Sequence, residues 1–443
     1  MKLVVKIYAV VVMLLVMGAK PAKSQEKSLS LNECIQYALE NSTTMGRAGN
    51  TVVSQKSALE QKKAQRGPDL SLSANESLSS GNSYSNTEDK WNRETSSNMN
   101  VSLSSNITLY NGARIKNAIL QGEINVSAAE TDIKTKEELL SLDVLSAFIS
   151  VLQAKEQVKN SQSQLNATEK LLEEASIKRE AGVMSPADYL NTRSQFASDK
   201  ASLVNSESSL RLALVGLMQT MNMPVSNSFD IVQPDTETLL KLNTETDAGI
   251  VYNVALGIQP GVKTARLELE SAEYDIQLAK GNYLPKLSLN GGLQTNYSSV
   301  SDINWGDQLT NQVTPALGLS LSIPIYQRKE VKNNVKQAAV ARDNYEYALT
   351  DIKNDLRKSI EQACLDVQIA QSSYQSYEEQ YLAEQESYKL AQEMFEQGML
   401  SSVDFNTSKN NLSAAENNFT GAKYDLILQN EIVEYYLGNK IEL

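Results

Sequence analysis

The chain contains two copies of one unit, and this duplication limits its fold more than any other feature. Three segments recur at an offset of 216 or 217 residues: 66–72, 103–116 and 180–188 resemble 283–289, 319–332 and 396–404. Because the three offsets agree within one residue over so much sequence, chance similarity is a poor explanation. We therefore expect a first structural repeat at 25–222, a linker rich in Pro, Asp and Asn at 223–247, and a second repeat at 248–443.

Each copy has the same predicted series of elements. A helical stretch (31–66; 248–283) precedes a strand (about 68–80; 285–298), and a loop rich in Ser, Asn and Gly leads to a second strand (99–109; 315–325). A long helix follows (about 112–181; 328–397), and a last helix (186–220; 402–437) runs back after a turn. The Gly and Pro residues that separate these segments support the boundaries.

The long helices are far longer than helices of ordinary globular domains. Residues 114–180 contain no Pro and only one Gly, and a helix of that length would extend about 100 Å at 1.5 Å per residue. Along it a large apolar residue recurs every seven positions, with a smaller residue three places later. The large residues are Val144, Val151, Val158, Leu165 and Leu172. This spacing predicts a close-packed heptad seam. In the second copy Tyr374, Tyr381, Tyr388 and Phe395 repeat in the same way, and we expect this aromatic stripe to serve packing.

The predicted strands have one apolar and one polar face. Leu317, Leu319 and Leu321 alternate with small or polar residues, and the other strands alternate likewise. In an exported protein the apolar face is suited to contact with lipid. Trp91 and Trp305 lie in the connecting loops and fit either an aromatic girdle or exposed loops. Four strands cannot close a membrane barrel, so we expect the chain to oligomerise, and three copies would supply twelve strands.

The N-terminal residues 1–24 have the order of a secretory signal peptide, with Lys2 and Lys6, an apolar run and a small-x-small end. A membrane anchor is the alternative, but the apolar run is about half of the ~20 residues that a spanning helix needs. Lipidation at Cys34 is not favoured, because Asn32 and Glu33 stand where small residues belong. Cys34 and Cys364 permit a disulfide but do not require one. The net charge of −12 argues against a nucleic-acid partner.

The last two helices of each copy are joined by a Gly-x-x-Ser-x-x-Asp turn, 182–188 and 398–404. Gly182 and Gly398 suit the left-handed conformation that ends a helix. The Ser and the acid three residues later are typical of a capping box, and Pro186 suits the first turn of a helix. Helix capping alone would explain these residues.

The duplicated unit, the Pro-x-Leu-x-Leu strand starts, the junctions at Tyr110 and Tyr326 and the two turns together resemble the TolC-type outer membrane factors over essentially the whole mature chain. The resemblance implies a mainly α-helical fold with a membrane β-barrel portion: a homotrimer with a 12-stranded barrel that continues into a long periplasmic α-helical barrel. It also implies a periplasmic adaptor and an inner-membrane transporter as partners, and a location in the outer membrane that extends into the periplasm. A nucleotide site is not needed, because the pump supplies the energy.

The resemblance further implies that the two turns form the periplasmic entrance and the adaptor contact. The entrance residues would be Asp404, Asp188, Phe395 and Phe405, and the contact residues Gly182, Val183, Met184, Gly398, Met399 and Leu400. The family pattern has a second acid and a basic residue where this chain has Thr407 and Leu400. We therefore do not expect a cation-binding ring or a salt-bridged closed state, and aromatic packing near Tyr189, Phe395 and Phe405 would replace them. Whether Asp404 acts in the pore or only caps its helix stays open.

The sequence thus favours a passive outer-membrane duct for efflux of drugs and toxic compounds. The same duct could serve type I protein secretion, and a periplasmic coiled-coil structural protein is a further alternative that the strand pairs disfavour. An enzyme is not expected, because the chain has no His, no metal-binding Cys spacing and no nucleophile motif. We expect no cofactor and no metal.

Overall fold

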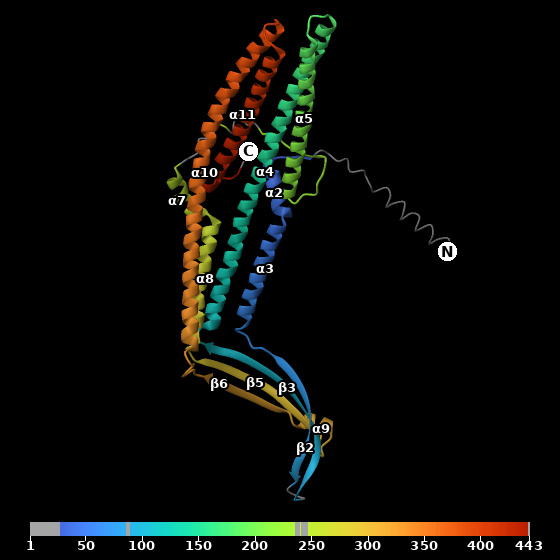
Figure 1. Cartoon of the computed structure of the whole chain (residues 1–443). Coiled ribbons are helices and arrows are strands. Elements are labelled where there is room, and N and C mark those ends of the chain that lie inside the picture. The colour runs from blue at the N-terminus through green and yellow to red at the C-terminus, as the bar shows by residue number, and fades with distance from the viewer. Residues whose placement is uncertain (1–26, 86–88, 235–239, 241–246, 442–443) are drawn as a thin grey trace, which may run out of the picture. The chain divides into compact units, whose positions relative to one another are not determined.

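The computed structural model describes residues 27–85, 89–234, 240 and 247–441 (Figure 1). The expected signal peptide and residues 235–239 and 241–246 of the expected linker lie outside these ranges. The described residues divide into two compact units. The first comprises the described parts of 1–46, 136–257 and 357–443, and the second comprises those of 47–135 and 258–356.

The two copies fold into the same series of elements, each with additions. The first copy holds β1 (Lys27–Leu29), α2 (Leu31–Asn41), α3 (Thr43–Ala64), β2 (Ser71–Ser85), β3 (Lys90–Asn111), α4 (Arg114–Glu180), α5 (Pro186–Thr220) and β4 (Phe229–Ile231). The second holds α7 (Ala248–Ile258), α8 (Pro260–Gly281), β5 (Lys286–Ser298), α9 (Trp305–Asn311), β6 (Thr314–Ser322), α10 (Glu330–Glu396) and α11 (Ser402–Tyr436).

The second unit contains a four-stranded antiparallel sheet in the order β2-β3-β5-β6 (Figure 1). The register places the apolar residues of all four strands on one face, since Leu72 is opposite Leu103, Leu103 opposite Leu293, and Leu289 opposite Leu319. These side chains are largely exposed, with 71 % of Leu72 and 65 % of Leu319 open to solvent. The sheet therefore presents an apolar face that nothing in the described part of the chain covers.

The loop between the first two strands is shorter than predicted. β2 and β3 continue through it as a two-stranded ribbon, and Tyr84 is opposite Trp91 near its end. Serine hydroxyls bond across the ribbon, with 2.9 Å between Ser79 Oγ and Ser96 Oγ. Cross-strand pairing therefore overrides the low strand propensity of Ser and Asn.

The corresponding segment of the second copy contains the short helix α9, which the sequence analysis did not predict. Asn304 caps α9 by accepting a hydrogen bond from Asp307 N at 3.0 Å. Gln308, which is 1 % exposed, bonds to the backbone of Ser298 and holds α9 against β5. The two copies therefore differ most in this connection.

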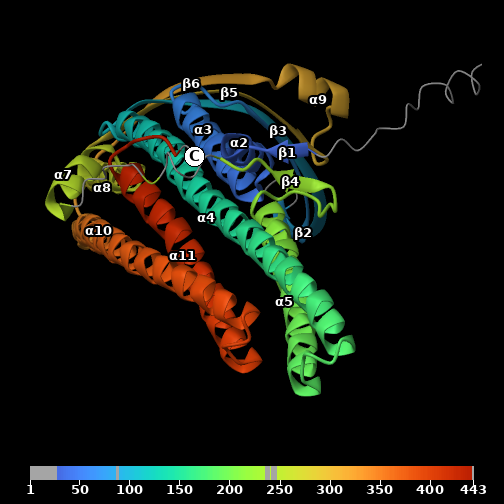
Figure 2. The same cartoon turned by 90° about the horizontal axis from the view of Figure 1, so that it is seen from above.

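Two antiparallel helix pairs, α4 with α5 and α10 with α11, dominate the first unit (Figures 1 and 2). The heptad positions of α4 face inward: Val144 and Val151 are fully buried, and the small positions Ser161, Thr168 and Ala175 are buried as well. A seam with small residues lets neighbouring helices approach closely. The predicted heptad face is thus the face that packs.

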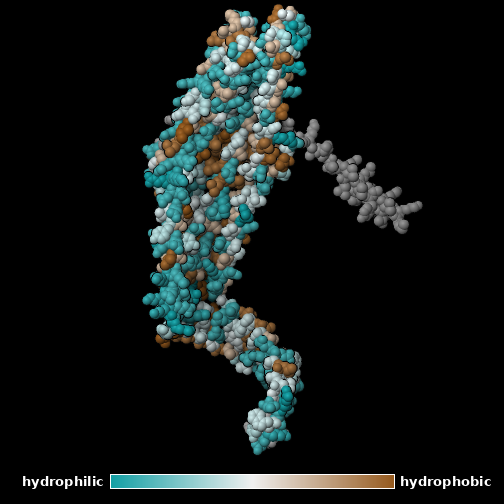
Figure 3. Space-filling view, in the orientation of Figure 1, coloured by the Kyte–Doolittle hydropathy of each residue, from teal (hydrophilic) through white to brown (hydrophobic). Residues whose placement is uncertain are grey.

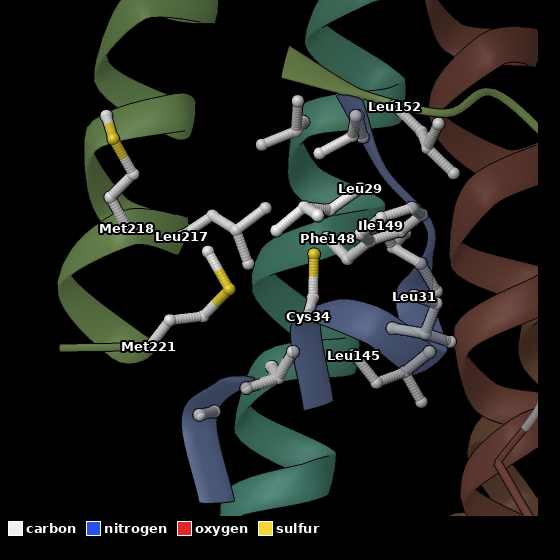
Figure 4. Close-up of a cluster of buried hydrophobic side chains, with 14 of the residues drawn as sticks. Leu29, Leu31, Cys34, Leu145, Phe148, Ile149, Leu152, Leu217, Met218 and Met221 are labelled. Atoms are coloured by element: carbon white, nitrogen blue, oxygen red, sulfur yellow. The ribbon is translucent and has the colours of Figure 1, made fainter. Parts of the chain in front are cut away.

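The main apolar core also lies in this unit, where α2, α4 and α5 meet the parallel pair β1 and β4. Figure 4 shows its labelled side chains, among them Leu29, Cys34, Phe148 and Leu217, converging from these elements. The α2 helix enters this core from a full capping box at Ser30 and Glu33. Cys34 and Cys364 are both buried and are not joined in a disulfide.

The compact units do not coincide with the two sequence repeats. Each unit takes segments from both copies, because the strands of one copy pair with those of the other and the helices of both copies share seams. Among the described residues, no helix combines the length and the apolar character that a membrane span requires.

Candidate functional site

The turn between α4 and α5 ends one helix and starts the next with main-chain geometry that only a few residue types allow. Gly182 has φ +74°, and Val183 N donates to Lys178 O at 3.0 Å, which closes the end of α4. Ser185 then caps α5, and Pro186 occupies its first turn. Glycine adopts this positive φ without the strain that a Cβ atom adds.

The turn between α10 and α11 has the same construction. Gly398 has φ +73°, Met399 N donates to Met394 O at 2.8 Å, and Ser401 caps α11. The repeated sequence pattern thus encodes a repeated turn. We call the two turns, residues 181–190 and 397–406, the hairpin tips; both belong to the first unit.

The serine and the acid of each tip form half of the expected capping box. Ser185 Oγ accepts from Asp188 N at 3.1 Å, and Ser401 Oγ accepts from Asp404 N at 3.2 Å. The carboxylates, which would accept from the serine amide in a full box, instead accept from the serine hydroxyl, at 2.6 Å for Asp188 and 2.7 Å for Asp404. Capping therefore accounts for both acids.

Asp188 has a second contact that connects the tips. Ser402 Oγ donates to Asp188 Oδ1 at 2.6 Å, and Asn191 Nδ2 donates to Ser402 Oγ at 3.2 Å. The hydrogen bonds from Ser185 and Ser402 lower the pKa of the Asp188 carboxyl. Asp404 is the equivalent residue in the second sequence repeat, and it is exposed. The two acids are thus equivalent in sequence but differ in their surroundings.

The apolar tip residues divide into exposed and groove-lining ones. Val183 is 76 % exposed and Met399 is 62 % exposed, and hydrophobic side chains are visible at the ends of both hairpins in Figure 3. Met184 and Leu400 are half-buried and line a groove of about 460 Å³ between the tips, together with Phe395. The expected contact residues Gly182, Val183, Gly398 and Met399 are all on the surface.

The aromatic residues pack between α10 and α11, as predicted for the stripe. Phe395 stacks on Phe405 with 4.6 Å between ring centroids, and Tyr381 stacks on Phe419 at 5.5 Å. Phe405 is only 2 % exposed, so within this chain its ring lies buried between the helices. Its part at the tip is the support of Phe395. Tyr189 lies under the guanidinium of Arg179, 4.2 Å from its ring centroid.

Sequence reasoning missed a buried ion pair that joins the two copies. Lys409 of α11 is 2 % exposed and donates to Asp199 Oδ2 of α5 at 2.6 Å; Thr168 of α4 hydrogen-bonds to both. Gln195 also donates to Asp199 Oδ1, at 2.9 Å. Burial lowers the pKa of the Lys409 ammonium, although the pair with Asp199 opposes that shift. The sequence signal that could have found it is the position of Lys409. It follows Phe405 by four residues, which places both on the same face of α11.

Among the described residues, no three His, Cys, Asp or Glu side chains gather in a way that could hold a metal ion. The contacts of the tips are hydrogen bonds, ring contacts and apolar surfaces. Such groups can bind and support a partner surface.

A family model described as outer membrane efflux protein matches residues 34–223 and 251–439. Outer membrane protein TolC of Salmonella enteritidis is 23 % identical over 321 residues, which are 69 % of this chain and 62 % of that protein. The pyoverdine export outer membrane protein OpmQ of Pseudomonas aeruginosa is 24 % identical over 272 residues, which are 61 % of this chain and 54 % of that protein. The chain thus matches less than two thirds of the length of these two relatives.

Among solved structures, the outer membrane protein VceC of Vibrio cholerae superposes with a TM-score of 0.76 at 15 % identity. The superposition covers 93 % of this chain and 97 % of VceC. The likeness therefore extends over both copies of the repeat.

Proposed function

Because this chain belongs to the outer membrane efflux protein family, we propose that it is the outer-membrane duct of a tripartite export system. It is an outer-membrane protein, as its family is. In the proposed system three protomers form a passive conduit, a periplasmic adaptor docks on the hairpin tips, and an inner-membrane transporter supplies the energy. Small molecules such as drugs and toxic compounds are the proposed cargo.

The observation that carries the proposal is the sheet with one apolar face and two open edges. The outer strands β2 and β6 each have one strand neighbour in the described part of the chain. They run in opposite directions, since three successive antiparallel pairings separate them. β6 of one protomer can therefore pair antiparallel with β2 of the next protomer. Three protomers of four strands each would close a barrel of twelve strands. Closure removes the free edges, which lipid does not tolerate.

The height of the apolar face supports a bilayer location for this barrel. The face extends along β5 from Leu287 to Tyr297, about ten residues, or about 34 Å of strand. A tilt of about 40° reduces this to about 25 Å, the height of the apolar band of outer-membrane barrels. Tyr110 is level with Leu287 at one border, and Tyr297 lies at the other. Tyrosines at both borders suit the two interfaces of a membrane.

The hairpin tips support the adaptor part of the proposal. Val183 and Met399 expose apolar side chains beside a groove, and the caps and Gly turns hold them in fixed positions. Apolar anchors beside a groove are the usual core of a protein–protein contact. Asp404, exposed at the start of α11, is the proposed acid of the entrance.

Small-molecule efflux is the proposed cargo class, and the relative OpmQ is named for the export of pyoverdine. Protein secretion through the same duct is the alternative. A transporter co-purified with the adaptor would distinguish them, because the pump determines what enters the duct.

Photo-crosslinking in cells tests the proposal. A photoreactive amino acid replaces Met399, and the control position is Leu317, which is 80 % exposed on the apolar face of the sheet. We expect Met399 to capture a periplasmic adaptor and Leu317 to capture lipid or neighbouring copies. Capture of only the protein's own copies from Met399, in exported protein, would contradict the adaptor contact.

A further inference from the structure

The polar face of the four-stranded sheet has an unusual composition over the length of the apolar band. At this level every residue on that face of β2, β3, β5 and β6 is Ser, Thr, Asn, Gln, Gly or Ala. The charges that share this face lie at its ends, Asp69 and Lys286 at one end and Lys90 and Glu94 in the ribbon at the other. The face between them is polar but uncharged.

One row of this face consists of asparagine. Asn75, Asn100 and Asn296 are directly opposite one another on β2, β3 and β5, and all three are exposed. Each amide carries both a donor group and an acceptor group. A row of amides can therefore hydrogen-bond to anionic, cationic and neutral groups alike, whereas a ring of fixed charges selects one sign.

The serines of the face are tied to one another. Ser71 Oγ lies 2.8 Å from Ser104 Oγ, and Ser73 Oγ lies 2.7 Å from Ser102 Oγ. These hydroxyl pairs bond across the strands, which leaves the larger asparagine and glutamine amides as the most prominent polar groups of the face. The face has the chemistry of a lining along which solutes pass, because it offers no fixed charge that would retain an ion.

We infer that the asparagine rows of three protomers, each on β2, β3 and β5, place neutral amides in the lumen of the strand section, through which organic solutes of either charge sign pass without selection. This inference rests on the proposed function, since only the trimeric barrel turns the polar face into a lumen. It specifies the cargo further: the strand section discriminates by size and hydrogen bonding and not by charge.

Reversal potentials of the full chain in planar bilayers under a KCl gradient test this inference. The variants are Asn100→Asp and Asn100→Lys, with Asn100→Gln as the neutral control. Ser97→Lys is the control for the other face, where Ser97 Oγ donates to Glu76 Oε1 at 2.9 Å, so the added ammonium can pair with Glu76.

We expect Asn100→Asp to raise and Asn100→Lys to lower the potassium-to-chloride permeability ratio, each by about tenfold. A unit charge about 6 Å from a passing ion in water favours one ion about threefold and disfavours the other about threefold. Asn100→Gln and Ser97→Lys should leave the ratio unchanged. A matching pair of organic ions, tetraethylammonium and benzenesulfonate, should show shifts in the same directions.

Two results would overturn the inference while leaving the duct intact. If the channels conduct but neither charge at Asn100 changes the potassium-to-chloride permeability ratio, this face does not line the conduction path. A response to Lys with none to Asp would mean that fixed negative charge already governs the section. Absence of conductance in the unmodified protein would instead count against the proposed function itself.

Discussion

Lys409 and Asp199 bury opposite charges where three helices meet, and the duplication does not repeat them. The equivalents of these two residues, at an offset of 216, are Arg193, which is exposed, and Ala415, which is fully buried. The pair therefore belongs to the contact of α5 with α11 within one chain. A buried charge is tolerated only when its partner and further hydrogen bonds are present, and Thr168 and Gln195 supply them here.

Removal of one partner should cost more than removal of both. Lys409→Met leaves the Asp199 carboxylate buried without its counter-charge, and we expect a loss of about 3–5 kcal/mol in the free energy of unfolding. Lys409→Met combined with Asp199→Leu should lose clearly less. Thermal unfolding in detergent, followed by far-UV circular dichroism, measures both. Arg193→Met is the matched control at the exposed equivalent position, and equal losses in the single and double variants would contradict the coupling.

Asp188 should make the contact between the tips sensitive to acid. Its folded pKa is lowered, so the stabilisation by its ionised form is complete above the ordinary carboxyl pKa and is lost as the pH falls through the lowered folded value. Ser402→Ala removes one of the two donors, so the variant should lose less on acidification. Hydrogen exchange of peptides that cover 183–192, compared between about pH 2 and pH 5, measures the difference. Equal acid responses in the two proteins would argue against this role of Ser402.

At the scale of the elements, the sequence patterns predict regular structure closely. α4 and α10 end within two residues of the expected bounds, and β5 begins one residue later than predicted. Heptad and period-two patterns carry this information along the chain itself. The β2–β3 ribbon, α9 and the β1–β4 pair were not predicted, because hydroxyl pairing, the Gln308 contact and pairing across about two hundred residues depend on tertiary structure.

The candidate site was predictable in part for the same reason. Gly182, Gly398 and the two serines follow local rules of helix termination, so the tips could be placed from sequence. The hydrogen bond from Ser402 to Asp188 joins residues of different sequence repeats, and no local sequence pattern predicts it. Phe405 was assigned to the entrance with Phe395, yet its 2 % exposure follows from packing that only the assembled helices reveal.

The tip glycines give an element-scale prediction with an internal control. At Gly182 and Gly398 a Cβ atom would meet no other atom within 4 Å, so the cost of alanine is backbone strain alone. We expect each substitution to destabilise the protein by about 1 kcal/mol. Gly216 within α5 has equal space and no positive φ, and alanine there should stabilise by about 0.5–1 kcal/mol. Thermal unfolding of the three variants decides, and a stabilised Gly398→Ala protein would refute the strain argument.

At the scale of the whole molecule, the two sequence repeats are not independent domains. Each compact unit draws on both copies, and the sheet alternates from β3 of the first to β5 of the second. The apolar face and the two outer edges remain open in a single chain. We propose that neighbouring protomers cover the two edges and that lipid covers the apolar face.

Disulfide cross-linking between the sheet edges tests this central claim most directly. Leu72→Cys on β2 is combined in turn with Leu317→Cys, Leu319→Cys and Leu321→Cys on β6, all on the apolar face. The native thiols should interfere little because both are buried, and burial, with a smaller contribution from Glu33, raises the pKa of Cys34 to about 12.

After oxidation in isolated outer membranes, non-reducing electrophoresis should show covalent dimers and trimers for at least one pair, and monomers for every single variant. Monomers in all three double variants, or a cross-link within one chain, would contradict closure of the sheet between copies.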